Sequence, residues 1–458
     1  MVLKRKIYDK LVDWKNNKTK SALLIEGARR IGKSTIVKKF GIENYKSYIV
    51  IDFAKASKKL KDNFNYNLNN LDVFFQNISL EYNTKLYVNE SLIIFDEIQK
   101  FPKAREAIKY LIEDSRYDFI ETGSLISIKE NVQDILIPSE EYKLKMYPLD
   151  FEEFLWALDE TLLAEHIKNC AKTLTPLENH YHKKAMRLFY EYMLVGGMPQ
   201  SVVAYVGNNK DFEASDKEKR LILSLYKDDI SKANNKYKLK INALFENIPG
   251  YLSTHEKEVT LSSIDKNNRF NNYSDSFFWL EDSMICNTCY KCNDPNIGFS
   301  LNKNESKVKC YMGDTGLLVS HAFNESELKT NNLYKDIISG KLSLNKGMLY
   351  ENIIAQMIVS SGRKLYFYSH YSIEKKRNDI EIDFIISNEI KTHFKVNPIE
   401  VKSAKNYTNV SYNLFRKKFG KNIDKGIIVH PKQLIAKDNE LRMPPYIFFF
   451  FIAYSNLN

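Results

Sequence analysis

The segment GARRIGKST, residues 27–35, constrains the fold of this chain more than any other part of the sequence. The apolar run SALLIE at residues 21–26 precedes it, and apolar residues at helical spacing follow it. A loop with the spacing GxxxxGK[ST] between a strand and a helix is typical of a phosphate-binding P-loop. Its backbone N–H groups converge on phosphate oxygens at the positive end of the helix. The segment therefore predicts an α/β fold with a nucleotide site at the end of this strand.

The residues of this loop have expected roles in binding ATP. We expect the side chain of Lys33 to reach the β and γ phosphates, and the hydroxyl of Ser34 to ligate Mg²⁺. ATP and Mg²⁺ are therefore the predicted cofactors. The residues expected to line the nucleotide along the loop are Gly27, Ala28, Arg29, Arg30, Ile31, Gly32, Lys33, Ser34 and Thr35.

A second segment, SLIIFDE at residues 91–97, supports the same site, because it is an apolar strand that ends in two carboxylates. Ligands of open α/β sheets bind at the carboxyl ends of the strands. We expect Asp96 to hold the Mg²⁺ shell, and Glu97 to orient and polarise the attacking water. Lys33 and Glu97 are thus the predicted catalytic residues of an ATP hydrolase.

Three further short apolar runs predict a parallel sheet of five strands with crossover helices. They lie at residues 48–53, 118–124 and 144–147. In the second of these runs, the hydroxyls of Thr122 and Ser124 are candidates for sensing the γ-phosphate. A strand between the P-loop strand and the strand of Asp96, together with a catalytic-type glutamate, indicates the AAA-like division of P-loop proteins.

The length and composition set the number of domains and the classes of partner. A chain of 458 residues exceeds one hydrophobic core, so we expect two to four domains. The formal charge of +11 permits a nucleic-acid partner without requiring one. The N-terminus lacks a signal-peptide pattern, and the longest apolar run, residues 446–454, is shorter than the roughly 20 residues of a membrane-spanning helix. We therefore expect a cytoplasmic protein without membrane contact, and we interpret this run as a closing buried strand.

The five cysteines are an odd number in a chain without an export signal, which suits reduced thiols. They are Cys170, Cys286, Cys289, Cys292 and Cys310. The last four have a spacing that invites a zinc site. However, the alternation in SMICNTCYKC predicts a strand that places Cys286 and Cys289 on opposite faces. Small buried apolar cysteines are therefore the alternative interpretation.

These motifs, with others along the chain, resemble a broad prokaryotic family of AAA-type ATPases that carry a C-terminal domain of unknown function with a nuclease-like core. The resemblance covers nearly the whole length. It rests on GARRIGKST, IIFDEIQKFP, ETGSLIS, YPLDFEEFLWAL, LVGGMPQSV, DTGLL, EIDFII and PIEVKSAK. Many relatives have a Gly-Arg pair before YPLDFEEF, where this chain has Ile-Pro-Ser-Glu-Glu. Arg30 and Arg105 lie near the site in sequence, but no arginine finger is assigned.

The resemblance and the residue patterns together predict four domains and the fold class α/β. These are a P-loop ATPase core with a parallel sheet at residues 1–150, a helical lid at 151–235, a winged-helix-like domain at 236–325, and a restriction-endonuclease-like α/β domain at 326–458. The pair Gly196-Gly197 interrupts the lid, either as a structural turn or as a hinge. The last helix of the winged-helix segment carries Asp275, Glu281 and Asp282 and no arginine, so DNA contact and protein contact both stay open.

The C-terminal region has the pattern of PD-(D/E)XK nucleases: Glu351 on a helix, Asp383 on one strand, and Glu400 with Lys402 on the next. Because strand side chains alternate with a period of two, Glu400 and Lys402 emerge on one face, where Asp383 can meet them. We expect Asp383 and Glu400, with Glu351 near by, to bind Mg²⁺, and Lys402 to position or activate a water. Asp383, Glu400 and Lys402 are the catalytic candidates here, although many such cores bind without cutting.

Two functions follow from these patterns. The first is an ATP-hydrolysing AAA-type enzyme coupled to a DNA-directed nuclease-like module, with double-stranded DNA as the partner. The alternative is an ATP-dependent signalling or assembly switch whose C-terminal domain is a non-cleaving binding platform. A homo-oligomer is expected only by analogy with other AAA-type sites.

Overall fold

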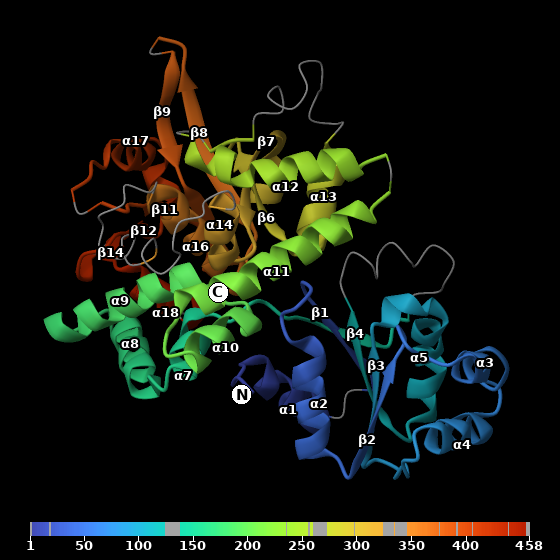
Figure 1. The fold of residues 1–458 in the computed structure, drawn as a ribbon. Coiled ribbons are helices and arrows are strands. Elements are labelled where there is room, and N and C mark those ends of the chain that lie inside the picture. The colour runs from blue at the N-terminus through green and yellow to red at the C-terminus, as the bar shows by residue number, and fades with distance from the viewer. Residues whose placement is uncertain are drawn as a thin grey trace. The chain divides into compact units, whose positions relative to one another are not determined.

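Five parallel strands form the sheet that carries the P-loop (Figure 1). The computed structural model describes residues 2–17, 20–123, 138–234, 236–254, 257–259, 273–296, 298–323, 334, 346–374, 376–390, 393–404, 406–437 and 439–454. The chain divides into two compact units, one of residues 2–147 with 282–284, and one of residues 148–281 with 285–458. Each unit has its own sheet or sheets.

The first unit is a parallel sheet in the order β2-β3-β4-β1-β5, with α1 and α2 on one side and α3, α4 and α5 on the other (Figure 1). Its elements are α1 (Ile7–Asn16), β1 (Ala22–Glu26), α2 (Lys33–Asn44), β2 (Ser47–Asp52), α3 (Lys58–Tyr66), α4 (Leu71–Glu81), β3 (Ser91–Asp96), η1 (Ile98–Lys100), α5 (Pro102–Asp114), β4 (Asp118–Gly123) and β5 (Glu141–Lys145). The strand predicted between the P-loop strand and the strand of Asp96 is β4, which confirms the prediction.

The apolar runs of β1 and β3 are buried along their whole length, as expected for strands covered by helices on both faces. A cluster of buried side chains from β1 to β4 packs against α3, α4 and α5. The fifth strand begins at Glu141 and ends at Lys145, earlier than predicted. It is an edge strand in which Leu144 is the buried residue and Tyr142 is half exposed, so its apolar pattern is weak.

The second unit combines a helical region with two sheets, ordered β10-β11-β12-β14-β13 and β7-β6-β8-β9. Its helical region comprises α7 (Phe151–Ala157), α8 (Thr161–Thr173), α9 (Asn179–Val195), α10 (Pro199–Gly207), α11 (Phe212–Ser231), α12 (Lys238–Ser253) and α13 (Ser274–Asp282). The remaining elements are β6 (Cys286–Cys292), η4 (Phe299–Asn302), β7 (Lys303–Met312), α14 (Thr315–Ala322), α16 (Lys346–Ser360), β8 (Leu365–Ser372), β9 (Arg377–Ile382), β10 (Phe384–Ile390), β11 (His393–Val401), α17 (Val410–Phe419), η5 (Gly420–Asn422), β12 (Gly426–Val429), β13 (Ile435–Lys437), β14 (Glu440–Met443) and α18 (Pro445–Tyr454).

The region predicted to be winged-helix-like, residues 236–325, contains an antiparallel hairpin of β6 and β7. However, β6 also pairs in parallel with β8, with Cys289 opposite Leu365. One sheet therefore contains strands from both sides of the boundary predicted at residue 325. Part of the region predicted to be winged-helix-like, residues 260–272, lies outside the described residues.

The prediction of a closing strand at residues 446–454 is wrong, because residues 445–454 form the helix α18. The residues from Pro445 to Ile452 are all buried, so the run has apolar residues on every side and no amphipathic period. Periodicity cannot separate a fully buried helix from a buried strand, and the four consecutive phenylalanines favoured the strand. The helix packs against α8, α9 and α16.

The glycine pair between α9 and α10 lies at a closely packed junction. Gly196 has a φ of 79°, and the N–H of Gly197 donates a 2.6 Å hydrogen bond to Asp314 Oδ2. A Cβ added to Gly197 would lie 2.1 Å from the carbonyl oxygen of Leu149. Three segments that carry the family resemblance, around residues 149, 197 and 314, therefore meet here. This packing supports the interpretation of the pair as a structural turn.

Candidate nucleotide site and acidic cluster

The P-loop is shaped by two glycines that no other residue can replace without strain. Gly32 has a φ of 91° and immediately precedes α2. A Cβ on Gly27 would lie 2.3 Å from Ile31 Cδ1 and 2.6 Å from the carbonyl oxygen of Met146. Because neither position accepts a side chain, the loop can turn tightly and present its backbone N–H groups at the start of α2.

Lys33 is folded into its own loop. Its Nζ donates to the carbonyl oxygens of Gly27 and Ala28, both at 2.9 Å. Burial lowers the pKa of Lys33 to about 8, although Glu97 and Asp96 act in the opposite direction. The ammonium group therefore lies inside the loop at the carboxyl edge of the sheet, close to two carboxylates.

A pair of hydroxyl groups converges on Asp96. Ser34 Oγ donates to Asp96 Oδ1 at 2.8 Å, and Thr122 Oγ1 donates to the same oxygen. These side chains come from α2, β3 and β4, so the sheet order is what brings them together. A hydroxyl oxygen beside a carboxylate fits the oxygen-rich coordination that Mg²⁺ prefers. The other sensing candidate, Ser124, lies outside the described residues.

Glu97 follows the end of β3 in a left-handed backbone conformation, with a φ of 55°. Its Oε2 accepts a 2.6 Å hydrogen bond from Gln99 Nε2. The side chain is partly exposed, so water can reach it, whereas Gln99 is buried. Sequence reasoning missed Gln99, which lies in the short helix η1 directly after the two acids.

Arg5 braces the P-loop from outside the motif. Its Nη1 donates to the carbonyl oxygen of Ile31 at 3.1 Å, and its Nη2 donates to the carbonyl oxygen of Tyr147 at 2.6 Å. The side chain is buried. The sequence contains no signal for this contact, since Arg5 lies 26 positions before Ile31.

Arg105 forms a buried ion pair with Glu141, which neutralises its charge. Its Nε and Nη2 each donate to an oxygen of Glu141 at 2.7 Å. Both carboxylate oxygens of Glu121 are buried without a hydrogen-bond partner, and burial, followed by the charge of Glu141, raises the pKa of Glu121 well above its usual value. Arg105 therefore neutralises acids inside the sheet. Arg29 and Arg30 lie exposed on the P-loop itself.

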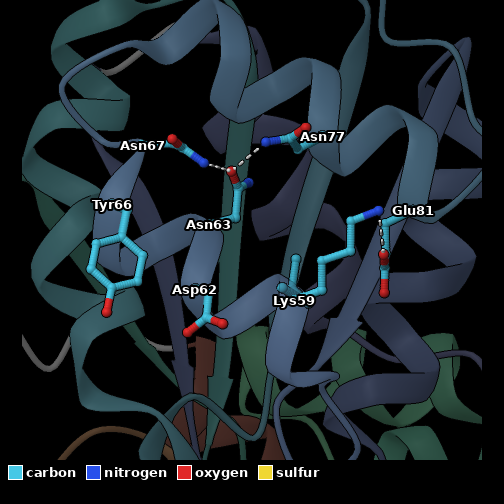
Figure 2. A pocket seen from close by; sticks show the side chains of 8 residues that line it. Lys59, Asp62, Asn63, Tyr66, Asn67, Asn77 and Glu81 are labelled. Carbon is cyan, nitrogen blue, oxygen red and sulfur yellow. Dashed lines mark hydrogen bonds and ion pairs between the residues drawn. The ribbon is translucent and has the colours of Figure 1, made fainter.

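A polar pocket lies between α3 and α4, and its buried amide group is hydrogen-bonded to neighbouring residues of the chain (Figure 2). Asn63 Oδ1 accepts hydrogen bonds from the side-chain amides of Asn67 and Asn77, and its own amide donates to the carbonyl oxygen of Phe74. The whole lining is Lys59, Leu60, Asp62, Asn63, Tyr66, Asn67, Asn77 and Glu81. Because the buried amide is fully paired within α3 and α4, we assign the pocket no ligand.

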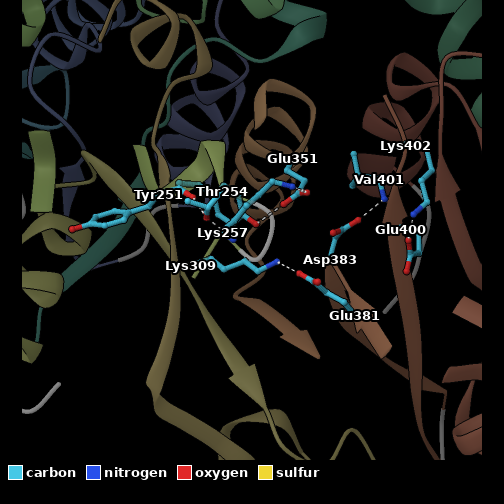
Figure 3. A network of polar contacts seen from close by, with 11 residues as sticks. Tyr251, Thr254, Lys257, Lys309, Glu351, Glu381, Asp383, Glu400, Val401 and Lys402 are labelled. Atoms are coloured by element: carbon cyan, nitrogen blue, oxygen red, sulfur yellow. Dashed lines mark hydrogen bonds and ion pairs between the residues drawn. The ribbon is translucent and has the colours of Figure 1, made fainter. Parts of the chain in front are cut away.

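The second unit brings together the acids and the lysine predicted near the C-terminus (Figure 3). Asp383 lies in the break between β9 and β10, Glu400 lies in β11, and Lys402 follows that strand. Lys402 Nζ is 2.5 Å from Glu400 Oε2, and Asp383 Oδ2 accepts a 2.8 Å hydrogen bond from the N–H of Val401. The other oxygen of Glu400 is buried without a partner.

Two lysines that sequence reasoning missed also enter this cluster. Lys257 Nζ forms an ion pair with Glu351 Oε1, and Lys309 Nζ lies 3.2 Å from Glu381 Oε1. Burial alone would raise the pKa of Glu351, but the charges of Lys257 and Lys309 lower it below its usual value. Burial, followed by the charges of Glu351 and Glu400, raises the pKa of Asp383.

The acids predicted as metal ligands in the second unit are engaged by lysines and a backbone N–H. In the described parts of the chain, no group of three or more histidine, cysteine, aspartate or glutamate side chains is placed to hold one. All five cysteines are buried thiols, and burial raises the pKa values of Cys286, Cys289 and Cys292. The metal roles of Glu351, Asp383 and Glu400 therefore stay predictions.

Comparison with protein families identifies the first unit. Residues 19–155 match the family described as an AAA domain. Residues 186–328 and 346–446 match two families that are each described as a domain of unknown function, DUF8612 and DUF4143. The chain thus contains an AAA-type P-loop ATPase domain, followed by two regions whose family descriptions name no activity.

Comparison with solved structures adds only distant similarities. A Walker-type ATPase of Pyrococcus abyssi is 13% identical over 70% of this chain and 96% of its own, with a TM-score of 0.41. The Thermotoga maritima RuvB Holliday junction branch migration motor is 14% identical over 62% of this chain and 89% of its own, with a TM-score of 0.29. No curated protein matches the chain, and no described helix is long and apolar enough to cross a membrane.

Proposed function

We propose that this chain binds Mg-ATP at the P-loop and hydrolyses it. The observation that carries the proposal is the convergence of Ser34, Asp96 and Thr122 beside Lys33 at the carboxyl edge of the sheet. Lys33 supplies a positive charge for the terminal phosphates, and the N–H groups at the start of α2 supply donors. Bound Mg²⁺ would supply charge neutralisation of the phosphate oxygens, held through Ser34 and Asp96.

Within this proposal Glu97 orients and polarises the attacking water. Its carboxylate is partly exposed, next to Asp96 on the chain, and fixed through Oε2 by Gln99. An acid held in this way accepts a proton from a water in line with the terminal phosphate. Thr122 acts by positioning Asp96, to which it donates a hydrogen bond.

The test is steady-state ATP hydrolysis by the full chain and by Glu97→Gln, which keeps the size of the side chain but removes its basicity. We expect both proteins to bind ATP and the variant to lose turnover. If the wild type binds ATP but turns it over no faster than the variant, Glu97 is not the base, and the nucleotide-switch function replaces this proposal.

We further propose that the C-terminal region is a nuclease-like module that acts on DNA. The order α16, β8, β9 with β10, β11, α17 and β12, with acids on the helix and on both central strands, supports a PD-(D/E)XK-like core. Exposed basic residues lie beside it: Lys376 and Arg377 near the turn between β8 and β9, and Arg416 and Lys417 on α17, which packs against β9. Such a surface suits a phosphate backbone.

Salt-dependent binding of double-stranded DNA tests this second proposal. Each lysine or arginine that neutralises one phosphate should contribute about 0.9 to the slope of log affinity against log salt. The double variant Arg377→Ala/Lys417→Ala should therefore bind more weakly and with a shallower slope. If the wild type shows no DNA binding at low salt and DNA does not stimulate its ATPase activity, the C-terminal region is a platform for another partner.

A further inference from the structure

The backbone conformation of Lys257 fixes the position of its side chain next to Glu351. Its N–H donates a 3.1 Å hydrogen bond to Thr254 Oγ1, and its φ is 54°, in the left-handed region that non-glycine residues seldom adopt. The N–H of Val259 donates to the carbonyl oxygen of Val308 in β7 at 2.9 Å. The segment 257–259 is therefore attached to the edge of β7, and this attachment directs the side chain of Lys257 onto Glu351 (Figure 3).

Both oxygens of Glu351 have partners within the chain. Oε1 pairs with the ammonium of Lys257, and Oε2 accepts a 3.1 Å hydrogen bond from the hydroxyl of Tyr311. Side-chain exposure is 13% for Lys257 and 5% for Glu351, so the ion pair is largely shielded from water. A divalent cation at Glu351 would have to displace a lysine that has little solvent to move into.

The charges of the whole cluster are nearly balanced by the chain itself. Its four carboxylates are Glu351, Glu381, Asp383 and Glu400, and its three ammonium groups are Lys257, Lys309 and Lys402. A set of buried carboxylates needs a counter-ion, which a bound metal supplies in many sites. Here three of the four carboxylates form ion pairs with lysine ammonium groups. The fourth, Asp383, accepts a hydrogen bond from a backbone N–H.

We propose that Lys257 takes the place of a metal ion in this cluster, so that the native chain binds no divalent cation between Glu351, Asp383 and Glu400. The inference rests on the proposed nuclease-like core and refines it. Such a core keeps the shape and the basic surface that suit nucleic acid, but it lacks the cation that metal-dependent phosphodiester hydrolysis requires. The C-terminal module is then a binding platform.

The test is Mn²⁺ binding to the full chain without nucleotide, followed by electron paramagnetic resonance. Wild type and Asp383→Asn should bind the same amount of Mn²⁺. Lys257→Met keeps most of the aliphatic side chain but removes the charge, so no buried ion pair has to be broken. This variant should gain one further Mn²⁺ site, with an affinity at least about 100-fold above any binding that the wild type shows there. That gain should disappear in Lys257→Met/Asp383→Asn.

Lys307→Met is the matched control, since Lys307 lies in β7 and pairs at 3.1 Å with Glu258, the residue after Lys257. It should bind Mn²⁺ like the wild type. The inference would be overturned if the wild type bound an Mn²⁺ ion that Asp383→Asn does not bind. It would also be overturned if Lys257→Met folded but gained no Mn²⁺ site. If Lys257→Met does not fold, the comparison of wild type with Asp383→Asn still decides. ATP hydrolysis, assayed separately, reports on the P-loop and not on this cluster.

Discussion

Ser34 Oγ donates a 2.8 Å hydrogen bond to Asp96 Oδ1, which joins the first turn of the P-loop helix to the end of β3. Thr122 donates to the same oxygen from the neighbouring strand. The order of the strands thus places a hydroxyl–carboxylate pair at the carboxyl edge of the sheet. A preassembled pair costs no reorganisation when charge develops during phosphoryl transfer.

Asp96→Asn should lower the rate of ATP hydrolysis about 100-fold or more, the size typical of losing one preorganised electrostatic contact. The amide keeps the shape but not the negative charge that Mg²⁺ needs. Asp52→Asn is the matched control, because Asp52 ends the adjacent strand β2 directly opposite Asp96. Steady-state phosphate release measures both, and equal rates for the two variants would contradict the role of Asp96.

Arg5→Ala should weaken ATP binding and lower the free energy of unfolding of the first unit by about 2–3 kcal/mol, since two buried carbonyls lose a charged donor. Arg5→Lys keeps the charge but can make fewer of the two bonds, and should lie between the wild type and the alanine variant. Urea denaturation and ATP titration measure the two effects. Unchanged ATP affinity in Arg5→Ala would show that the brace does not shape the loop.

The buried ammonium group of Lys219 leads us to predict that the free energy of unfolding rises with pH. Burial lowers its pKa to about 8, despite Asp216 and Asp314, whereas an unfolded lysine titrates near 10.4. Between these values the unfolded chain binds more protons, so the free energy of unfolding increases with pH, by at most about 1.4 kcal/mol per unit.

Lys219→Met removes this titration. The difference in unfolding free energy between wild type and variant should therefore move in favour of the wild type from pH 8 to pH 10. Denaturation curves at several pH values measure it. A difference that stays flat or falls over this range would contradict the prediction.

Gly197→Ala should destabilise the second unit by about 2 kcal/mol or more, because the added Cβ would overlap the carbonyl oxygen of Leu149. Gly250→Ala is the control: it lies inside α12 with nothing within 4 Å of its added Cβ. That change should stabilise the helix by about 0.5–1 kcal/mol. Thermal denaturation should move in opposite directions for the two variants.

The sequence predicted the elements whose local pattern is strong, and missed the contacts made across long separations. The P-loop, the strand of Asp96 and the helix of Glu351 are short-range patterns of residue type and period. Arg5 and Lys257 carry no such signal, because each acts on a residue 26 or 94 positions away. The strand predicted at residues 446–454 failed for another reason, since the helix α18 is buried on every side and has no period to read.

The pairing of β6 with β8 limits where the chain can be cut into stable fragments and which segments can be exchanged between related genes. The sheet β7-β6-β8-β9 takes two strands from residues 286–312 and two from residues 365–382. A fragment cut at residue 325 would expose the unpaired N–H and C=O groups of β8, an edge prone to non-native pairing. Recombination between relatives should therefore exchange both strand pairs together, and a gene fusion that carried only the last third of the chain would yield a protein that aggregates.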